Sequence, residues 1–132
     1  MLELVNVIVA ALAAYAFGAV WYIVLAKPWT VASGIPVDAE GRPQGTGSPM
    51  PFVIGFLCIL VVAGMMRHIF ASMAMESISD GIMGGAGLGA FIITPWLLMC
   101  YTYGMRPLRL TLIDGGYAVI GCTIIGVVLT LF

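Results

Sequence analysis

The sequence predicts an all-α integral membrane protein, a four-helix bundle built from a single transmembrane domain over residues 1–132. Composition is the first reason: 62% of the residues are hydrophobic, only 8% are charged, and the mean hydropathy is +1.14. Soluble domains are far more polar than this. The second reason is that the apolar residues gather into long runs, each able to cross a ~30 Å hydrocarbon layer at ~1.5 Å per residue. We expect helices at residues 4–26, 52–75, 82–103 and 107–132.

Prolines mark where these helices should begin, end or bend. Lys27-Pro28 should end the first helix, because proline disfavours a helical conformation at the residue before it. That helix should be retained rather than removed as a signal, since no basic residue precedes its apolar run. Residues 28–51 are rich in Gly, Pro and polar side chains and predict a solvated loop. Pro95 should kink or break the third helix locally, and Pro107 should open the fourth.

The charged residues predict how the chain crosses the membrane. All basic residues except Arg67 lie in or beside the first and third connections, whereas Glu3, Glu76 and Asp80 lie on the opposite side. The positive-inside rule therefore predicts cytoplasmic loops 1 and 3, with both termini outside, in a bacterial inner membrane. Aromatic and basic side chains near the helix ends should anchor the protein at the lipid interface. These are Trp21, Tyr22, Lys27, Trp29, Arg106 and Arg109.

Small residues recur at four-residue spacing in three of the predicted helices. Such stripes let helix backbones approach closely inside a membrane. Packing within one chain is the simpler interpretation, and self-association or contact with another membrane protein is the alternative. The stripes are Ala10, Ala14 and Gly18 in the first helix, Gly81, Gly85 and Gly89 in the third, and Ala118, Cys122 and Gly126 in the fourth.

Two motifs carry a family resemblance. The first is Gly18-Ala19-Val20-Trp21-Tyr22 followed by Lys27-Pro28-Trp29. The second is Arg106-Pro107-Leu108-Arg109-Leu110 leading into Ile113-Asp114-Gly115-Gly116-Tyr117. Their order and separation resemble the bacterial membrane-protein family catalogued as domain of unknown function 1761, over essentially the whole chain. The resemblance implies a small four-span membrane protein and brings no activity with it.

Polar residues inside the apolar runs are the candidate functional residues. Asp114 lies about two turns into the fourth helix, where a carboxylate requires a partner or hydration. A hydrogen bond to a Tyr, Thr or Lys27 of a neighbouring helix is one interpretation, and proton or cation handling is the other. Arg67 should lie more than ~10 Å deeper than Asp114, too far for an ion pair, and should extend outward to Glu76, Asp80 or Glu3. His68 and Tyr117 are further candidates.

The sequence predicts no catalytic, cofactor-binding or metal-ligating residues. A lone His68 makes neither a metal site nor a catalytic triad. The pattern Gly85-Ala86-Gly87-Leu88-Gly89-Ala90 matches a dinucleotide fingerprint but lies in a membrane span, not after a strand. A net charge of −1 does not indicate a nucleic-acid partner.

We therefore expect a non-enzymatic accessory or structural subunit that packs in the lipid bilayer against a larger bacterial membrane complex, an energy-converting or pigment assembly. The alternative is an oligomeric proton or small-solute transporter or channel that uses Asp114 and His68. The sequence identifies no cofactor. A lipid, a quinone or a pigment at the helix surface is the kind of ligand that such a protein would bind.

Overall fold

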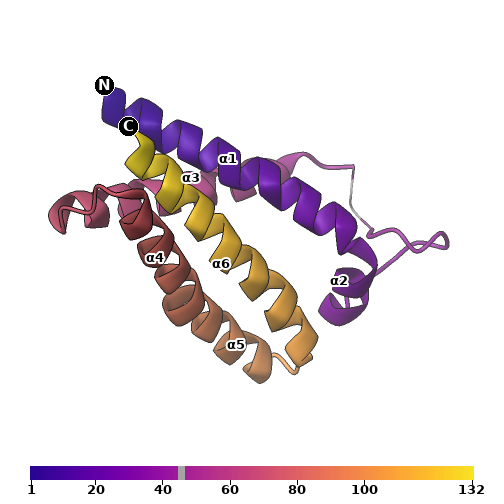
Figure 1. Ribbon diagram of the computed structural model, residues 1–132. Coiled ribbons are helices and arrows are strands. Elements are labelled where there is room, and N and C mark those ends of the chain that lie inside the picture. The colour runs from indigo at the N-terminus through magenta and orange to yellow at the C-terminus, as the bar shows by residue number, and fades with distance from the viewer. Residues whose placement is uncertain (45–46) are drawn as a thin grey trace.

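Long apolar helices form the body of the protein. The computed structural model describes residues 1–44 and 47–132 (Figure 1). Four helical segments are long and apolar enough to cross a membrane: α1 (Leu2–Val24), α3 (Met50–Ser72), the segment Ile78–Tyr103 and α6 (Leu108–Leu131). The predicted all-α, four-span architecture is confirmed, and most helix ends lie within a few residues of the predicted ones.

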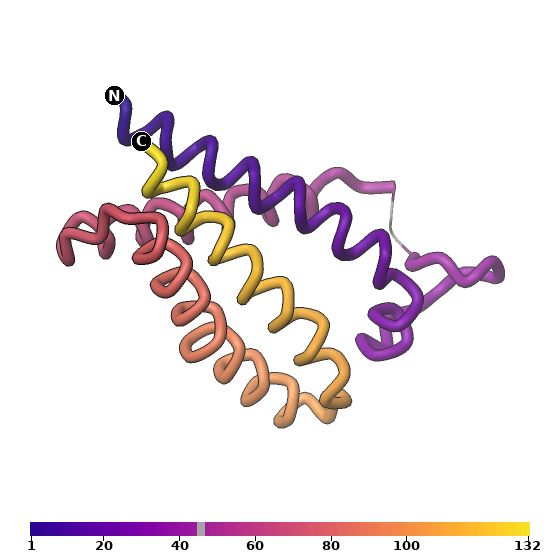
Figure 2. The backbone as a smooth tube through the Cα atoms, viewed as in Figure 1, coloured from indigo at the N-terminus to yellow at the C-terminus, as the bar shows by residue number. Residues whose placement is uncertain are grey.

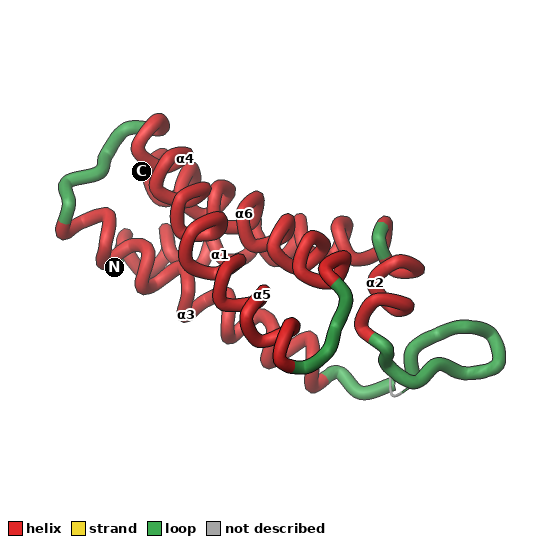
Figure 3. Tube along the Cα trace, turned by 90° about the horizontal axis from the view of Figure 1, so that it is seen from below, coloured by secondary structure: helices red, strands yellow, loops and turns green. Residues whose placement is uncertain are grey.

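The chain runs up and down through the bundle. The connections before α3 and before α6 lie at one end, whereas both termini and the α3–α4 connection lie at the other (Figures 2 and 3). The two ends of the chain are linked directly, because the Asn6 amide donates to the carbonyl oxygens of Leu129 and Phe132. Loops 1 and 3 therefore share one side of the protein, as the sequence predicts.

A short helix, α2 (Ala26–Ser33), occupies the start of the segment predicted to be a solvated loop. Helix α1 ends at Val24, before Pro28, so the proline falls in the first turn of α2. The N–H groups in the first turn of a helix have no acceptor within that helix, so a proline in this position costs no hydrogen bond. Gly34 ends α2 with a left-handed φ of 68°. The prediction of a loop over 28–51 is thus corrected: the irregular segment begins at Gly34.

The third span contains a widened turn next to Pro95. It comprises α4 (Ile78–Leu88), a π-helical turn η1 (Gly89–Ile93) and α5 (Thr94–Tyr103). The Thr94 N–H donates to the carbonyl of Gly89, one residue further back than in an α-helix, and the Thr94 hydroxyl donates to the same oxygen at 2.7 Å. Proline has no N–H to donate, and in a regular helix its ring clashes with the carbonyl group of the preceding turn. The wider π turn gives this carbonyl group room. The predicted local break at Pro95 takes this form.

The third span also begins earlier than predicted, at Ile78 instead of residue 82. Ser77 and Asp80 form a reciprocal capping box, in which the Ser77 hydroxyl accepts from the Asp80 N–H at 3.0 Å and the Asp80 carboxylate accepts from the Ser77 N–H at 3.2 Å. This arrangement satisfies two of the free N–H groups at a helix start.

Helix α6 lies between α1 and the α4–α5 segment (Figure 1). The glycine stripe of α4 faces the small residues of α6 in antiparallel register. A Cβ atom at Gly89 would lie 2.6 Å from the Cα of Val119, so the two backbones are in direct contact. The α4 stripe therefore packs within the chain. The facing pairs are Gly81 with Gly126, Gly85 with Cys122, and Gly89 with Ala118.

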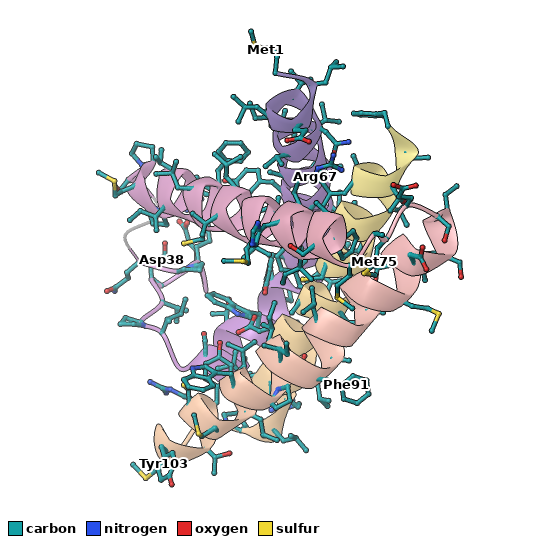
Figure 4. The ribbon with its side chains drawn as sticks, turned by 90° about the vertical axis from the view of Figure 1, so that its left-hand side faces the viewer. Met1, Asp38, Arg67, Met75, Phe91 and Tyr103 are labelled. Carbon is teal, nitrogen blue, oxygen red and sulfur yellow. The ribbon has the colours of Figure 1, made fainter. Side chains whose placement is uncertain are left out.

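Helix α3 packs mainly against α1 and crosses the other spans steeply (Figure 4). Arg67 points from α3 toward α1, where its Nη2 lies 3.6 Å from the Glu3 carboxylate. Its Nη1 donates to the carbonyl of Leu129 in α6 at 3.4 Å. The predicted outward reach of Arg67 to Glu3 is confirmed. Farther from the termini, α3 diverges from α5 and α6 and leaves a space between them.

Candidate functional site: a cavity around Asp114

That space is a cavity of about 840 Å³ bounded by α1, α2, α3, α5 and α6. Its walls are largely apolar, and its polar side chains gather at the end near loop 1. The single carboxylate among the described lining residues is Asp114. Representative wall residues are Gly55, Ile59 and Val62 of α3, Leu97 of α5, and Ile125 of α6.

Asp114 accepts three hydrogen bonds from three different helices. The Tyr22 hydroxyl of α1 donates to Oδ1 at 2.7 Å, and the Trp29 indole of α2 donates to the same oxygen at 3.2 Å. The Tyr101 hydroxyl of α5 donates to Oδ2 at 2.6 Å. Charged acceptors form shorter and stronger hydrogen bonds than neutral ones. Of the two interpretations of Asp114, the structure provides the hydrogen-bonded one, through Tyr and Trp donors and not through Lys27.

The two sequence motifs meet at this carboxylate because glycine makes room for bulky rings. The Trp21 indole donates to the carbonyl of Ile113 at 3.0 Å and lies against Gly116, where a Cβ would be 2.9 Å from Trp21 Cζ2. The next residue, Gly115, faces the opposite way, toward Thr94 of α5, whose Cγ2 would lie 2.8 Å from a Cβ. Two adjacent glycines thus let α6 approach α1 and α5 at once.

The motif that ends α1 therefore interlocks with the motif that begins α6. A family model described as "Protein of unknown function (DUF1761)" matches residues 5–130, nearly the whole chain. The chain belongs to the DUF1761 family. No curated protein and no solved structure matches it. Family membership confirms the resemblance drawn from the two motifs and assigns no function to this DUF1761 protein.

Aromatic rings surround the carboxylate of the DUF1761 site. Tyr22 makes edge contacts with Trp29 and with Tyr117, at ring-centroid distances of 6.1 and 5.5 Å. The Tyr117 hydroxyl donates to the carbonyl of Ala14 in α1 at 2.9 Å. Tyr117, a predicted candidate, thus lines the same cavity as Asp114. Among the described residues, His, Cys, Asp and Glu side chains form no group suited to a metal ion, so the site offers hydrogen bonding and charge.

The remaining predicted residues lie elsewhere or have different contacts. Arg67 belongs to the contacts at the terminal end of α3, and His68 is exposed on α3 and does not line the cavity. Lys27, Arg106 and Arg109 are exposed near one end of the bundle, where interface anchors would lie.

Trp21, Tyr22 and Trp29, which the sequence predicts as interface anchors, also bind α6 within the protein through their polar atoms. A buried indole or phenol needs a hydrogen-bond partner, and α6 supplies one. Tyr101 is a site residue that the sequence does not reveal. Tyr101 and Asp114 lie in different helices, so the spacing between them along the sequence does not indicate that they are in contact.

Proposed function

We propose that this DUF1761 protein is a non-enzymatic, multi-pass protein of the bacterial inner membrane that binds a membrane-soluble amphipathic molecule in the Asp114 cavity. The supporting observation is the cavity itself. Its volume of about 840 Å³ falls in the range of small-molecule sites, which are mostly apolar with a few convergent polar groups.

The distribution of polar and apolar groups supports an amphiphile. Asp114 lies six residues beyond the start of α6. At a rise of 1.5 Å per residue, the polar end of the cavity is therefore about 9 Å from the start of this helix. The apolar wall continues to Ile125, about 16 Å farther along the same helix. A head group at Asp114 would place an attached chain along the gap between α3 and α6. The charge bias of the loops supports a cytoplasmic position for this head-group end.

The expected role as an accessory subunit of a larger membrane complex is a second candidate. Only 11% of the apolar stretch of α3, and 11% of that in Ile78–Tyr103, is buried within the chain, against 39% for α6. Phe91, for example, is 81% exposed and points away from the bundle (Figure 4). Lipid or a partner helix would cover these faces. The transporter hypothesis receives less support, because His68 is not part of the cavity wall.

The binding proposal is tested by filling the cavity. Val62 of α3 lines it, whereas the adjacent Val61 is 72% exposed on the outer face. Native mass spectrometry of the protein in detergent, with 1-dodecanol and dodecylamine as probes, should show stoichiometric retention of a dodecyl chain by the wild type. Val62→Trp should lose this retention and the matched control Val61→Trp should keep it. Equal retention by the two variants, or none by the wild type, would overturn the proposal.

A further inference from the structure

The hydroxyl and indole donors among the described residues that line the cavity are already in use. Of the hydroxyl and indole groups that line it, those of Tyr22, Trp29 and Tyr101 donate to Asp114. The others donate to backbone carbonyl oxygens at 2.7 to 2.9 Å. These are Tyr15 to Phe52, Thr30 to Ala26, and Tyr117 to Ala14. The polar end of the cavity therefore presents acceptor oxygens to a ligand, whereas its hydroxyl and indole donors are engaged in hydrogen bonds within the protein.

The same end carries an uncompensated negative charge. Within the described part of the chain, no basic side chain forms an ion pair with Asp114. A carboxylate has about four acceptor positions, and three are filled, two of them on Oδ1. Oδ2, which accepts from Tyr101 alone, has a free position. A charge in an apolar environment is costly when no opposite charge is near.

The aromatic groups beside Asp114 favour the same sign of ligand. Tyr22 contacts both Trp29 and Tyr117 edge to face, and all three rings line the cavity that holds the carboxylate. Ring faces attract cations, and the attraction increases when water is excluded. A carboxylate flanked by Trp and Tyr rings is a suitable environment for an ammonium group, which brings both a positive charge and N–H donors.

We propose that the head group held at Asp114 is an ammonium group on a long apolar chain. This inference rests on the proposed binding function and specifies its ligand class. Quinones, carboxylates and phosphates offer acceptors only, and the described residues of the cavity wall keep no free hydroxyl or indole donor for them. Two sources share the required chemistry, a free long-chain amine and the amine head group of a membrane lipid.

The test compares probes that share a dodecyl chain and differ in the head group. Native mass spectrometry with dodecylamine, 1-dodecanol and dodecanoate should show that the wild type binds the amine at least about tenfold more tightly than the alcohol, and the carboxylate most weakly. Asp114→Asn keeps the size of the side chain and removes its charge. It should remove most of the preference for the amine and leave binding of the alcohol intact. The comparison of the three probes on the wild type does not depend on any variant, so it still tests the proposal if Asp114→Asn fails to fold.

The Trp29 indole provides a local signal, because its N–H donates to Asp114. Its ¹⁵N–¹H resonance, assigned through Trp29→Phe, should shift with dodecylamine, while that of Trp96, which is 67% exposed, should not. If the protein retains phosphatidylethanolamine in preference to phosphatidylglycerol from mixed nanodiscs, the amine is the head group of a lipid. If it binds dodecylamine and retains neither lipid, the ligand is a free amine. Equal binding of amine and alcohol would overturn this inference and leave the binding function standing. Binding of neither would overturn the binding function itself.

Discussion

The phenol of Tyr117 fills the space that a side chain at Gly18 would need. A Cβ atom at Gly18 would lie 2.6 Å from Tyr117 Oη and 2.7 Å from its Cζ. The ring has little freedom to move, since its hydroxyl donates to the carbonyl of Ala14 one turn earlier in α1. We predict that Gly18→Ala lowers the free energy of unfolding by about 1 to 3 kcal/mol, the usual cost of overpacking.

Equilibrium unfolding in mixed micelles, followed by circular dichroism, measures this cost. Gly87→Ala is the matched control, because a Cβ at Gly87 meets nothing within 4 Å. Alanine also has the higher helix propensity, so this control should be neutral or slightly more stable than the wild type. A Gly18→Ala protein as stable as Gly87→Ala would show that Tyr117 does not hold α1 against α6.

The α4–α6 contact predicts a larger effect at Gly85. A Cβ there would be 2.7 Å from the Cys122 carbonyl carbon and 2.8 Å from the Cα of Thr123. Backbone atoms cannot rotate away as a side chain can, so Gly85→Ala should cost about 3 kcal/mol or more. Gly64→Ala on α3, where a Cβ meets nothing within 4 Å, is the control. The same unfolding assay compares them, and a loss below that of Gly18→Ala would contradict the backbone contact.

Removing one donor from Asp114 should weaken the site measurably. Tyr101→Phe deletes a 2.6 Å hydrogen bond to the carboxylate and should lower the free energy of unfolding by about 1 to 2 kcal/mol. Tyr103→Phe removes the same atom from a side chain that is 86% exposed, and should change stability by less than about 0.5 kcal/mol. The Trp29 indole resonance should shift in Tyr101→Phe alone. A shift of equal size in both variants would argue against the shared carboxylate.

At the terminal end, burial decides which polar contact stabilises the fold. Asn6 is 1% exposed and donates to α6 carbonyl oxygens, so Asn6→Ala should cost about 1 to 3 kcal/mol. The Glu3 side chain is 78% exposed in its pair with Arg67, and Glu3→Gln should cost less than about 0.5 kcal/mol. Unfolding of the two variants in the same micelles makes the comparison. Comparable losses would mean that the Glu3–Arg67 pair is stronger than its exposure indicates.

The proposed orientation is open to chemical labelling. In a variant with Cys58, Cys100 and Cys122 replaced by alanine, a cysteine introduced at Ala39 in loop 1 should resist a membrane-impermeant maleimide added to intact cells. A cysteine at Ser79, which is exposed near the start of α4, should react. Permeabilised cells supply the control, in which both positions should be labelled. The reverse labelling pattern would show that the orientation is the opposite of the predicted one.

The sequence predicts the spans and their close packing well, because both depend on local properties. Run length and charge position determine where the chain can cross, and Gly81, Gly85 and Gly89 have the four-residue spacing that the α4–α6 contact uses. The capping box of Ser77 and Asp80 was also present in the sequence as a Ser-x-x-Asp pattern, and it accounts for the early start of α4.

The binding site is predicted less completely. Asp114 and Tyr117 are identifiable as polar residues in an apolar span, but the partners of Asp114 depend on how helices turn toward each other. Trp29 points at Asp114 because α2 continues past Pro28, and the steep crossing of α3 opens the cavity. Interhelical geometry of this kind leaves no periodic trace in one sequence.

The π turn of η1 sets the rotational phase of the third span. Four-residue steps from Gly81 through Gly85 to Gly89 would continue to Ile93, and each residue of an α-helix advances about 100°. The extra residue of the wide turn shifts the sequence by one place, so that Thr94 meets Gly115 and Tyr101 meets Asp114. If residues 89–94 instead closed into regular α-helical turns with every residue kept, Tyr101 would swing about 100° around the helix axis, and the carboxylate would lose a donor from a helix whose glycine contacts stayed in place.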